Sequence, residues 1–247
     1  MISVVIPALD AEARLAECLN AIVPAAMMEL VREVIVVDGG SQDKTVEIAE
    51  GFGARVIAAP QGRGGQLMAG ALAAKGEWYL FLHADTVLEG GWDDEARRFI
   101  DAHPDKAAVF TMRFDTQGAA PRIVAAGAMA RARIFRTPYG DQGLLISKTL
   151  YNETGGYADL PLMEDVDFIR RLIRVKGRGA LHILQSKALT SAERYARDGY
   201  ARRVMKNAAI LMRYHLGSKP EALARDYDGK KKKSHETKKQ LSSPQEG

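Results

Sequence analysis

The sequence predicts an α/β fold in which helices flank a mostly parallel sheet. Over the first 85 residues, short β-branched or apolar segments alternate with helical patterns, and glycines or acids follow most of these segments. This alternation is typical of right-handed β–α–β crossovers, which build parallel sheets. The chain has 247 residues, of which 47% are hydrophobic and 27% charged, so it is long and apolar enough to bury a sizeable core.

Four strands are predicted in this first part, at residues 2–6, 33–37, 55–57 and 78–82. The last of them consists of five consecutive large apolar residues, a pattern typical of a strand buried on both faces. Asp10 and Asp43 are predicted to cap the first two helices because short acidic side chains accept hydrogen bonds from a helix N-terminus. A glycine-rich loop at residues 62–65 precedes a third helix.

The pattern after residue 90 is less regular. Helices and strands are predicted there, in chain order, at residues 91–102, 107–114, 121–135, 143–147 and 164–174. The last helix begins with acids, which its dipole favours. A purely structural role for that acid cluster is therefore one of two interpretations.

Residues 200–216 form an amphipathic helical pattern. A helical wheel groups its apolar residues on one face, namely Tyr200, Val204, Met205, Ala208, Leu211 and Met212. Arg202, Lys206 and Arg213 lie on the opposite face. Two alternatives follow: the apolar face packs onto the domain, or it lies on an anionic membrane surface.

The formal net charge of +4 is concentrated at the C-terminus. Residues 230–247 contain six lysines and two glutamates, so the rest of the chain has 29 basic and 29 acidic residues. No nucleic-acid partner is therefore predicted. Residues 229–247 are polar and lysine-rich, and we expect them to be disordered.

Cys18 is the only cysteine, which excludes an intrachain disulfide and a cysteine zinc cluster; a buried thiol is expected. No signal peptide and no membrane-spanning segment are predicted. We therefore expect a cytoplasmic protein, with a peripheral position on the inner face of the cell membrane if the C-terminal helix binds lipid.

His83-Ala84-Asp85 follows the fourth predicted strand directly. Side chains two apart in a strand point the same way, so His83 and Asp85 could reach one metal ion. Ligands of open α/β sheets bind beyond the carboxyl ends of parallel strands, where Asp10, Asp38 and the loop at 62–65 would also lie. This arrangement predicts a nucleotide-binding site.

Several motifs in a fixed order resemble those of the family-2, A-type nucleotide-sugar glycosyltransferases, particularly the small bacterial single-domain members. They occupy residues 3–10, 36–45, 62–66, 83–85, 155–157, 163–165 and 191–195. The resemblance implies an A-type glycosyltransferase fold with a nucleotide-binding sheet. It further implies a domain at residues 1–217, divided into a nucleotide-sugar half (1–115) and an acceptor half (116–217), with a flexible tail at 218–247.

The resemblance also assigns roles to residues. Glu164 and Asp165 correspond to the catalytic pair, with Asp165 as the general base, and Asp38 to the residue that binds the nucleotide base. The residues implied to bind the nucleotide-sugar are Pro7, Ala8, Asp10, Glu12, Asp38, Gly39, Arg63, Gly64, His83, Ala84, Asp85 and Arg194.

Two positions depart from the family pattern. Asp10-Ala11-Glu12 replaces Asn-Glu, which leaves open which acid holds the nucleoside, and His83 replaces the first aspartate of the metal motif. The implied metal ligands are thus Asp85 and His83. Since imidazole suits manganese better than magnesium, the expected cofactor is a divalent cation, Mn²⁺ in preference to Mg²⁺.

The predicted function is that of an inverting, metal-assisted hexosyltransferase acting on a nucleotide-diphosphate sugar. One base leads to direct displacement and hence to inversion. The acceptor hydroxyl belongs to an unidentified small molecule or a lipid-linked compound. Alternatives are a nucleotidyltransferase that forms sugar nucleotides, and a non-catalytic, membrane-associated nucleotide-sugar-binding module. The nucleotidyltransferase would need a triphosphate-binding, glycine-rich loop after the first strand, where residues 7–10 stand instead.

Overall fold

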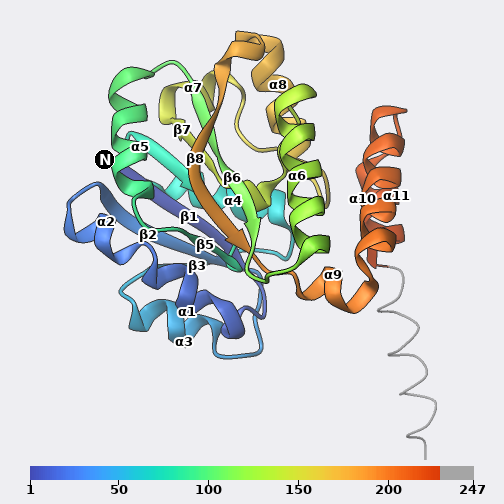
Figure 1. Ribbon diagram of the computed structural model, residues 1–247. Coiled ribbons are helices and arrows are strands. Elements are labelled where there is room, and N and C mark those ends of the chain that lie inside the picture. The colour runs from blue at the N-terminus through green and yellow to red at the C-terminus, as the bar shows by residue number, and fades with distance from the viewer. Residues whose placement is uncertain (229–247) are drawn as a thin grey trace, which may run out of the picture.

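The computed structural model describes residues 1–228 and contains one eight-stranded sheet in the order β3-β2-β1-β4-β7-β6-β8-β5 (Figure 1). The strands are β1 (Ile2–Ala8), β2 (Val31–Asp38), β3 (Arg55–Ala58), β4 (Trp78–Phe81), β5 (Thr86–Leu88), β6 (Ala107–Phe114), β7 (Leu144–Ser147) and β8 (Leu181–Thr190). The helices are α1 (Glu12–Asn20), α2 (Val23–Met27), α3 (Thr45–Gly51), α4 (Arg63–Ala73), α5 (Trp92–Ala102), α6 (Ala119–Ile134), α7 (Lys148–Glu153), α8 (Glu164–Lys176), α9 (Glu193–Asp198), α10 (Tyr200–His215) and α11 (Pro220–Asp228).

The predicted α/β class is confirmed. Strands β3, β2, β1 and β4 are mutually parallel, as the alternation of strands and helices predicts. From β7 onward the sheet is mixed, because β7 is antiparallel to both β4 and β6, and β5 is antiparallel to β8. The carboxyl ends of β1, β2 and β4 therefore share one edge, from which the loops described below extend.

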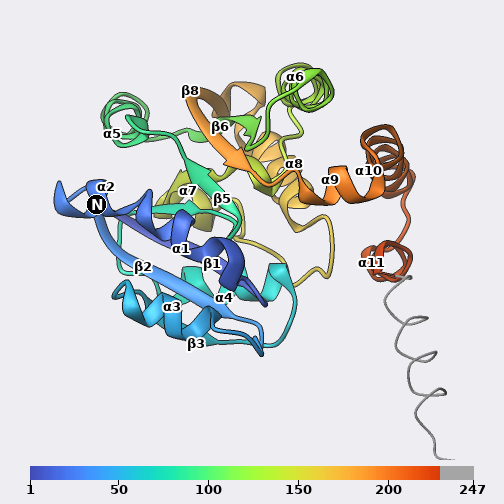
Figure 2. The ribbon, with the colours of Figure 1, turned by 60° about the horizontal axis from the view of Figure 1, so that its bottom comes forward.

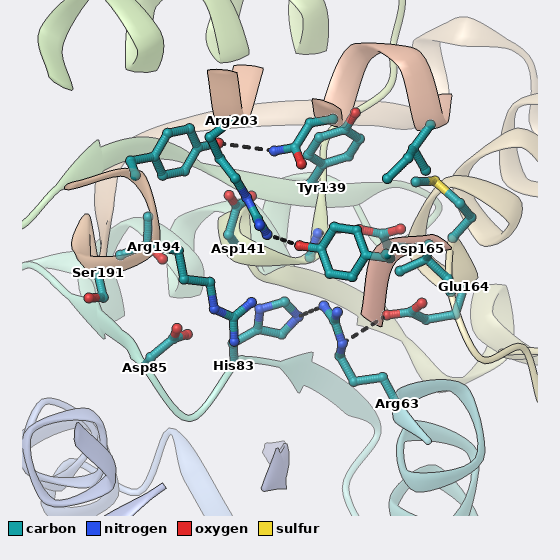
Figure 3. A pocket seen from close by; sticks show the side chains of 18 of the residues that line it. Arg63, His83, Asp85, Tyr139, Asp141, Glu164, Asp165, Ser191, Arg194 and Arg203 are labelled. Carbon is teal, nitrogen blue, oxygen red and sulfur yellow. Dashed lines mark hydrogen bonds and ion pairs between the residues drawn. The ribbon is translucent and has the colours of Figure 1, made fainter. Parts of the chain in front are cut away.

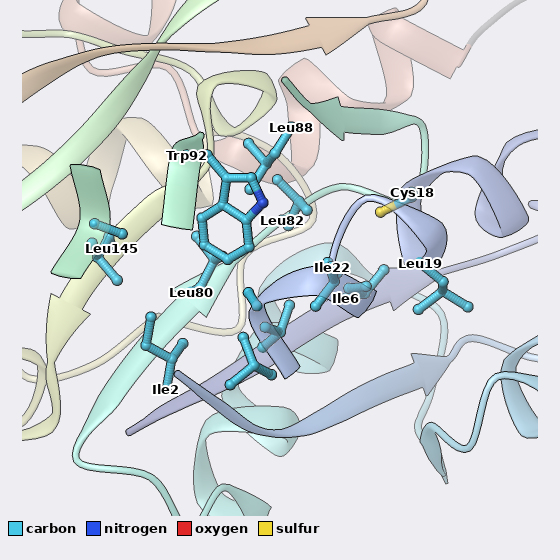
Figure 4. Packing of buried hydrophobic residues seen from close by; sticks show 14 of the residues in the cluster. Ile2, Ile6, Cys18, Leu19, Ile22, Leu80, Leu82, Leu88, Trp92 and Leu145 are labelled. Atoms are coloured by element: carbon cyan, nitrogen blue, oxygen red, sulfur yellow. The ribbon is translucent and has the colours of Figure 1, made fainter. Parts of the chain in front are cut away.

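Apolar side chains cover both faces of the sheet. Val4 and Ile6 of β1 belong to a cluster with helices α1 and α5, whereas Val5 belongs to a second cluster with α4 and α8. Figure 4 shows the first cluster, in which Trp92 lies against Leu82 and Leu88. Burial of β1 and β4 on both faces explains their continuous apolar sequences. Cys18 is buried in the first cluster, as expected.

Helix α4 packs against the sheet through glycines. A Cβ atom at Gly70 would collide with Val5 Cγ1 and lie 3.0 Å from Val37 Cγ2. At the start of the same helix, a Cβ at Gly64 would collide with Ala158 O and lie 2.6 Å from Leu160 N. The two glycines thus allow α4 to approach both the sheet and the loop that precedes α8.

Three predictions about local structure are wrong. Asp43 is not the N-cap of α3, which is Lys44, although Asp43 Oδ1 accepts a hydrogen bond from Thr45 N at 3.0 Å. Asp10 has a φ of 48° and does not cap α1, whose N-cap is Ala11; instead, Asp10 Oδ1 accepts a hydrogen bond from Gln42 N at 2.9 Å. The flexible tail does not begin at residue 218, because α11 forms there and buries Leu223 against Leu162 and Ile210. The predicted disorder of residues 229–247 concerns residues outside the described part of the chain.

Helix α10 forms where a helix was predicted. The alternative in which its apolar face packs onto the domain is not confirmed. Arg203 and Ile210 are its buried residues. Met205 and Met212, from the predicted apolar face, are 65% and 61% exposed. Within residues 1–228, none of the helices is long and apolar enough to cross a membrane.

We predict that Gly70→Ala lowers the free energy of unfolding by up to about 2 kcal/mol. The clash with Val5 exceeds the gain in helix propensity, since overpacking typically costs about 1–3 kcal/mol and alanine gains roughly 1 kcal/mol over glycine. Urea denaturation measures the change. Gly127→Ala in α6 is the matched control, because a Cβ there meets nothing within 4 Å, and it is expected to stabilise the protein. Equal effects of the two substitutions would contradict this account of α4 packing.

Candidate active site

A pocket of mixed charge opens between the turn after β4, the N-termini of α4 and α8, and helices α9 to α11 (Figure 3). Its charged lining consists of four acids and three arginines: Asp85, Asp141, Glu164, Asp165, Arg63, Arg194 and Arg203. All seven residues lie outside the strands, in helices, at helix starts or in turns. The pocket therefore brings together charges from segments far apart in the sequence.

Asp165 is held in a fixed orientation at the first turn of α8. Its Oδ2 accepts a hydrogen bond from Gly140 N at 2.6 Å, and its Oδ1 accepts one from Val166 N at 2.7 Å. Met163, at the N-cap of the helix, has a left-handed φ of 66°, which turns the chain into α8 just before this carboxylate. Each carboxylate oxygen still has a lone pair available, so Asp165 can accept a further proton.

Glu164 faces the other way and pairs with α4. Its side chain is 2% exposed, and its Oε1 lies 3.5 Å from Arg63 Nε. Burial raises the pKa of Glu164, and Asp165 adds to this, while Arg63 opposes it. The pair places a guanidinium at the pocket wall and ties α4 to α8.

His83 lies next to Arg63 as well. Its Nε2 is 3.5 Å from Arg63 Nη1, and a Cβ at Gly140 would come within 2.5 Å of Nε2. Burial and the charge of Arg63 lower the pKa of His83 to about 4, so the imidazole is neutral at pH 7. In Figure 3 the ring extends toward Arg63, whereas Asp85 lies on the other side of it.

The geometric premise of the proposed metal pair is wrong, although both residues line the pocket. Ala84 and Asp85 form a turn, closed by the hydrogen bond from Thr86 N to His83 O at 3.1 Å, so the alternation of a strand does not apply. Joint ligation by His83 and Asp85 stays a prediction.

The oxygen ligands of the pocket fit a divalent cation that is shared with a bound phosphate. Residues 1–228 contain no group of three or more His, Cys, Asp or Glu side chains positioned for a metal ion. Magnesium commonly binds through one or two carboxylates together with substrate phosphates and water. Asp85, at the pocket wall, can supply such a carboxylate.

The residues predicted to bind a nucleoside lie at the carboxyl ends of β1 and β2, outside the lining of this pocket. Asp38 accepts hydrogen bonds from Gly40 N, Ser41 N and Ser41 Oγ, so it shapes its own loop. Glu12 Oε2 accepts a hydrogen bond from Lys44 N at 3.0 Å. Asp10 and Glu12 thus both connect the loop after β1 to the loop after β2.

Pro7, Ala8 and Gly39 form the base of this same edge. Ala8 O accepts hydrogen bonds from Gly39 N and from Gln66 Nε2, both at 2.9 Å. Gln66 is buried and also donates to Val37 O. Sequence reasoning placed Gln66 in a motif but gave it no role, although a polar residue one turn into an otherwise small and apolar helix was a usable signal.

Asp141 is a second residue that sequence reasoning did not assign to the site. Its Oδ1 is buried without a hydrogen-bond partner among the described residues. Burial raises its pKa to about 6, and the charges of Asp165 and Asp85 add to this effect. A buried carboxylate oxygen without a partner is costly, which makes Asp141 a candidate to bind a hydroxyl group or cation of a ligand.

Arg203 and Tyr139 were missed as well, and both line the pocket. Arg203 lies 3.2 Å from Asp198 Oδ2 and donates to the hydroxyl of Tyr227. The ring of Tyr139 is covered by Arg131, whose Cζ is 3.5 Å from the ring centroid. Arg194, which was predicted, lines the pocket beside His83 (Figure 3).

Residues 3–157, more than half of the chain, match the family described as Glycosyl transferase family 2. The chain belongs to this family. A PGL/p-HBAD biosynthesis glycosyltransferase of Mycobacterium tuberculosis (strain ATCC 25177 / H37Ra) is 38% identical over 95 residues, which is 36% of each protein. One of Mycobacterium bovis (strain BCG / Pasteur 1173P2) matches equally. The chain thus aligns with about a third of the length of these curated relatives.

Solved structures show that the fold is the A-type glycosyltransferase fold. Glucosyl-3-phosphoglycerate synthase from Mycobacterium tuberculosis, in complex with Mn²⁺, UDP and glucosyl-3-phosphoglycerate, has a TM-score of 0.58 at 22% identity and covers 77% of this chain and 71% of its own. Residues 1–349 of S. aureus TarS match with a TM-score of 0.58 at 18% identity, and the match covers 77% of this chain and 60% of the TarS chain. At these identities the likeness concerns the fold alone.

We predict that Asp141→Asn stabilises the metal-free protein at pH 8 but not at pH 4. The pKa of Asp141 in the folded protein, about 6, exceeds the ordinary value of 3.8, so the unfolded chain loses this proton first as the pH rises. The cost of the buried charge is absent below about pH 4 and complete above about pH 6, where it reaches at most about 3 kcal/mol. Denaturation in EDTA from pH 4 to 8 measures it. A difference between the variants that does not change with pH would contradict the prediction.

Proposed function

We propose that this family member is an inverting glycosyltransferase of the hexosyltransferase type, which moves a sugar from a nucleotide-diphosphate sugar to an acceptor hydroxyl. One observation carries the proposal. The carboxylate of Asp165 is fixed by Gly140 N at the wall of a pocket that also contains Asp85 and Arg63. A base, a metal ligand and a phosphate-binding cation are the groups that this reaction needs.

The donor is proposed to lie along the carboxyl edge of the sheet. Its nucleoside would rest on the loops after β1 and β2, where Asp38 is the candidate for binding the base. Its diphosphate would reach Asp85, Arg63 and Arg194, because guanidinium groups pair well with phosphate oxygens. The similar synthase was solved with UDP, which supports a uridine nucleotide as the first donor to test.

The proposed transfer of the sugar needs only one base. The acceptor oxygen attacks the anomeric carbon and forms the new glycosidic bond, while the bond from that carbon to the diphosphate oxygen breaks. Asp165 takes the acceptor proton, and the bonding electrons leave with the nucleoside diphosphate. Attack from the face opposite the leaving group inverts the anomeric centre. Gly140 N holds Asp165 Oδ2, and the pairing of Glu164 with Arg63 keeps the neighbouring guanidinium at the pocket wall.

A divalent cation bound through Asp85 would neutralise charge on the diphosphate as a Lewis acid. The synthase was solved with Mn²⁺ and, in a further structure, with Mg²⁺ and UDP, which supports a divalent cofactor without deciding between the two ions. We propose Mn²⁺ because His83, a nitrogen ligand, lies in the same pocket. For His83 to bind the ion through Nε2, Arg63 would have to move away from it.

Membership of this family favours glycosyl transfer over the alternative of nucleotidyl transfer. The acceptor is proposed to enter beside Tyr139 and Tyr195, on the wall formed by α9 and α10. A non-catalytic binding module is excluded if the protein releases nucleoside diphosphate in an acceptor-dependent reaction.

Asp165→Asn should reduce turnover by about 10²–10⁴-fold, the usual contribution of a general base, while the Kd for nucleotide changes less than about twofold. The amide oxygen of asparagine can still accept one of the two backbone hydrogen bonds, that from Gly140 N, whereas the one from Val166 N is lost. Nucleoside diphosphate release and isothermal calorimetry measure the two quantities. Asp167→Asn, in the same helical turn but paired with Arg171, serves as the control and should remain active. An Asp165→Asn enzyme with more than a tenth of wild-type turnover would remove the base from the mechanism.

Chelation with EDTA should abolish activity, and Mn²⁺ should restore it more effectively than Mg²⁺. Asp85→Asn should weaken Mn²⁺ binding in the presence of UDP by about tenfold or more, since it removes the carboxylate of the site. Electron paramagnetic resonance of free Mn²⁺ provides this readout without turnover. The control is Asp94→Asn, an exposed acid on α5 away from the pocket. Unchanged Mn²⁺ affinity in Asp85→Asn would show that Asp85 is not a ligand.

A further inference from the structure

The solvent-facing side of α10 is apolar along its length. Val204, Met205, Met212 and Leu216 are exposed, with Leu216 at 79%. Ala201, Ala208 and Ala209 occupy the positions between them and are exposed as well. A helix on the surface of a soluble domain normally turns such a stripe inward. Here the stripe faces outward.

Polar interactions on the other side of α10 fix this orientation. Arg203 binds Asp198 and Tyr227, and Lys206 Nζ donates to Tyr227 O at 3.0 Å. Below them, Ile210 packs with Leu162 and Leu223. Turning the methionines inward would break these hydrogen bonds and remove Ile210 from its cluster.

Helix α6 and its C-cap carry further exposed apolar side chains next to α10. It contacts α10, and Figure 2 shows the two helices side by side along one flank of the domain. Ile123, Ile134 and Phe135 are 61–69% exposed there. We name this surface the outer apolar face; it comprises Ile123, Ile134, Phe135, Val204, Met205, Met212 and Leu216. Within residues 1–228 these residues remain 40–79% exposed.

All charges on these two helices are positive. Neither α6 nor α10 contains Asp or Glu, whereas Arg122, Arg133 and Arg202 are exposed on them. Arg213 is partly exposed and pairs with Asp226 of α11 at 2.7 Å. In the sequence, four lysines follow shortly after α11, at residues 230–233. An apolar stripe flanked by arginine and lysine matches the chemistry of a bilayer surface that contains anionic lipids.

We propose that the outer apolar face binds the surface of an anionic lipid bilayer, with α10 parallel to the membrane plane. A second copy of the chain fits less well, because twofold pairing would bring the arginines of both copies together, and charges of like sign repel.

Vesicle sedimentation with the full-length protein tests the proposal. Vesicles of phosphatidylglycerol and phosphatidylcholine in equal amounts should bind the protein, whereas pure phosphatidylcholine vesicles should bind it at least about tenfold less. Raising the salt concentration from about 0.05 M to about 0.5 M should weaken the binding, since screening shortens the range of electrostatic attraction.

Met205→Glu/Met212→Glu should reduce binding to the anionic vesicles by about tenfold or more, because it places two carboxylates in the stripe that would enter the bilayer. Leu72→Glu in α4 is the matched control: Leu72 is equally apolar and exposed but lies outside the outer apolar face, so binding should persist. Circular dichroism and nucleotide affinity verify that each variant is folded.

Three results would overturn the proposal: no binding to anionic vesicles, equal binding to both vesicle types, or equal loss in the double variant and in Leu72→Glu. Light scattering of the free protein could give a fourth result that would overturn it. A stable dimer that Met205→Glu/Met212→Glu dissociates would assign the outer apolar face to a second copy of the chain. Because none of these measurements requires turnover, they are independent of the proposed catalytic activity.

Discussion

The hydrogen bond from Gly140 N to Asp165 Oδ2 joins the parts of the chain on which the pocket depends. It connects the loop before β7 to the first turn of α8, and the same glycine lies against the ring of His83 at the end of β4. A Cβ atom at position 140 would lie 2.5 Å from His83 Nε2 and 3.5 Å from Asp165 Oδ2, so a side chain there would displace the imidazole. The position of Asp165 is therefore set by the backbone, which changes less readily than a side-chain contact.

Some charged groups of the pocket have a partner within the protein, and others do not. Glu164 has Arg63 as its partner, and Arg203 has Asp198, so these groups support the walls. Asp141 Oδ1 has no such partner in the described structure, and Arg194 forms no ion pair within residues 1–228. Groups that the protein leaves unsatisfied are those that a ligand can satisfy. The division separates residues that build the site from residues that are available to bind.

Much of the fold could be predicted from the sequence, because the first half of the chain relies on local signals. The apolar run of β4 and the acids or glycines after β1 and β2 suffice to predict a parallel sheet with functional loops at one edge. Strand β8 gave no such signal: its burial alternates irregularly, and its pairing with β6 shifts register between Val109 and Thr111.

The site was predictable where a motif lies within one segment and not where it depends on distant contacts. Asp85, Arg63, Glu164 and Asp165 were found from short motifs and all line the pocket. Arg203 became recognisable only once α11 placed Tyr227 beside it. The direction of α10 likewise depends on contacts with α11, whereas a helical wheel describes the faces of a helix but not which of them meets the protein.

Because Cys18 is the only cysteine of the chain, it decides how the protein can be labelled through thiols. Cys18 is fully buried between α1 and the sheet, where its thiol contacts His83 O at 3.5 Å, and burial raises its pKa so that no thiolate forms at neutral pH. Thiol-directed dyes and spin labels, which react with thiolates at accessible positions, will leave it unmodified. A cysteine introduced anywhere on the surface would then carry the only label, without removal of a native residue first.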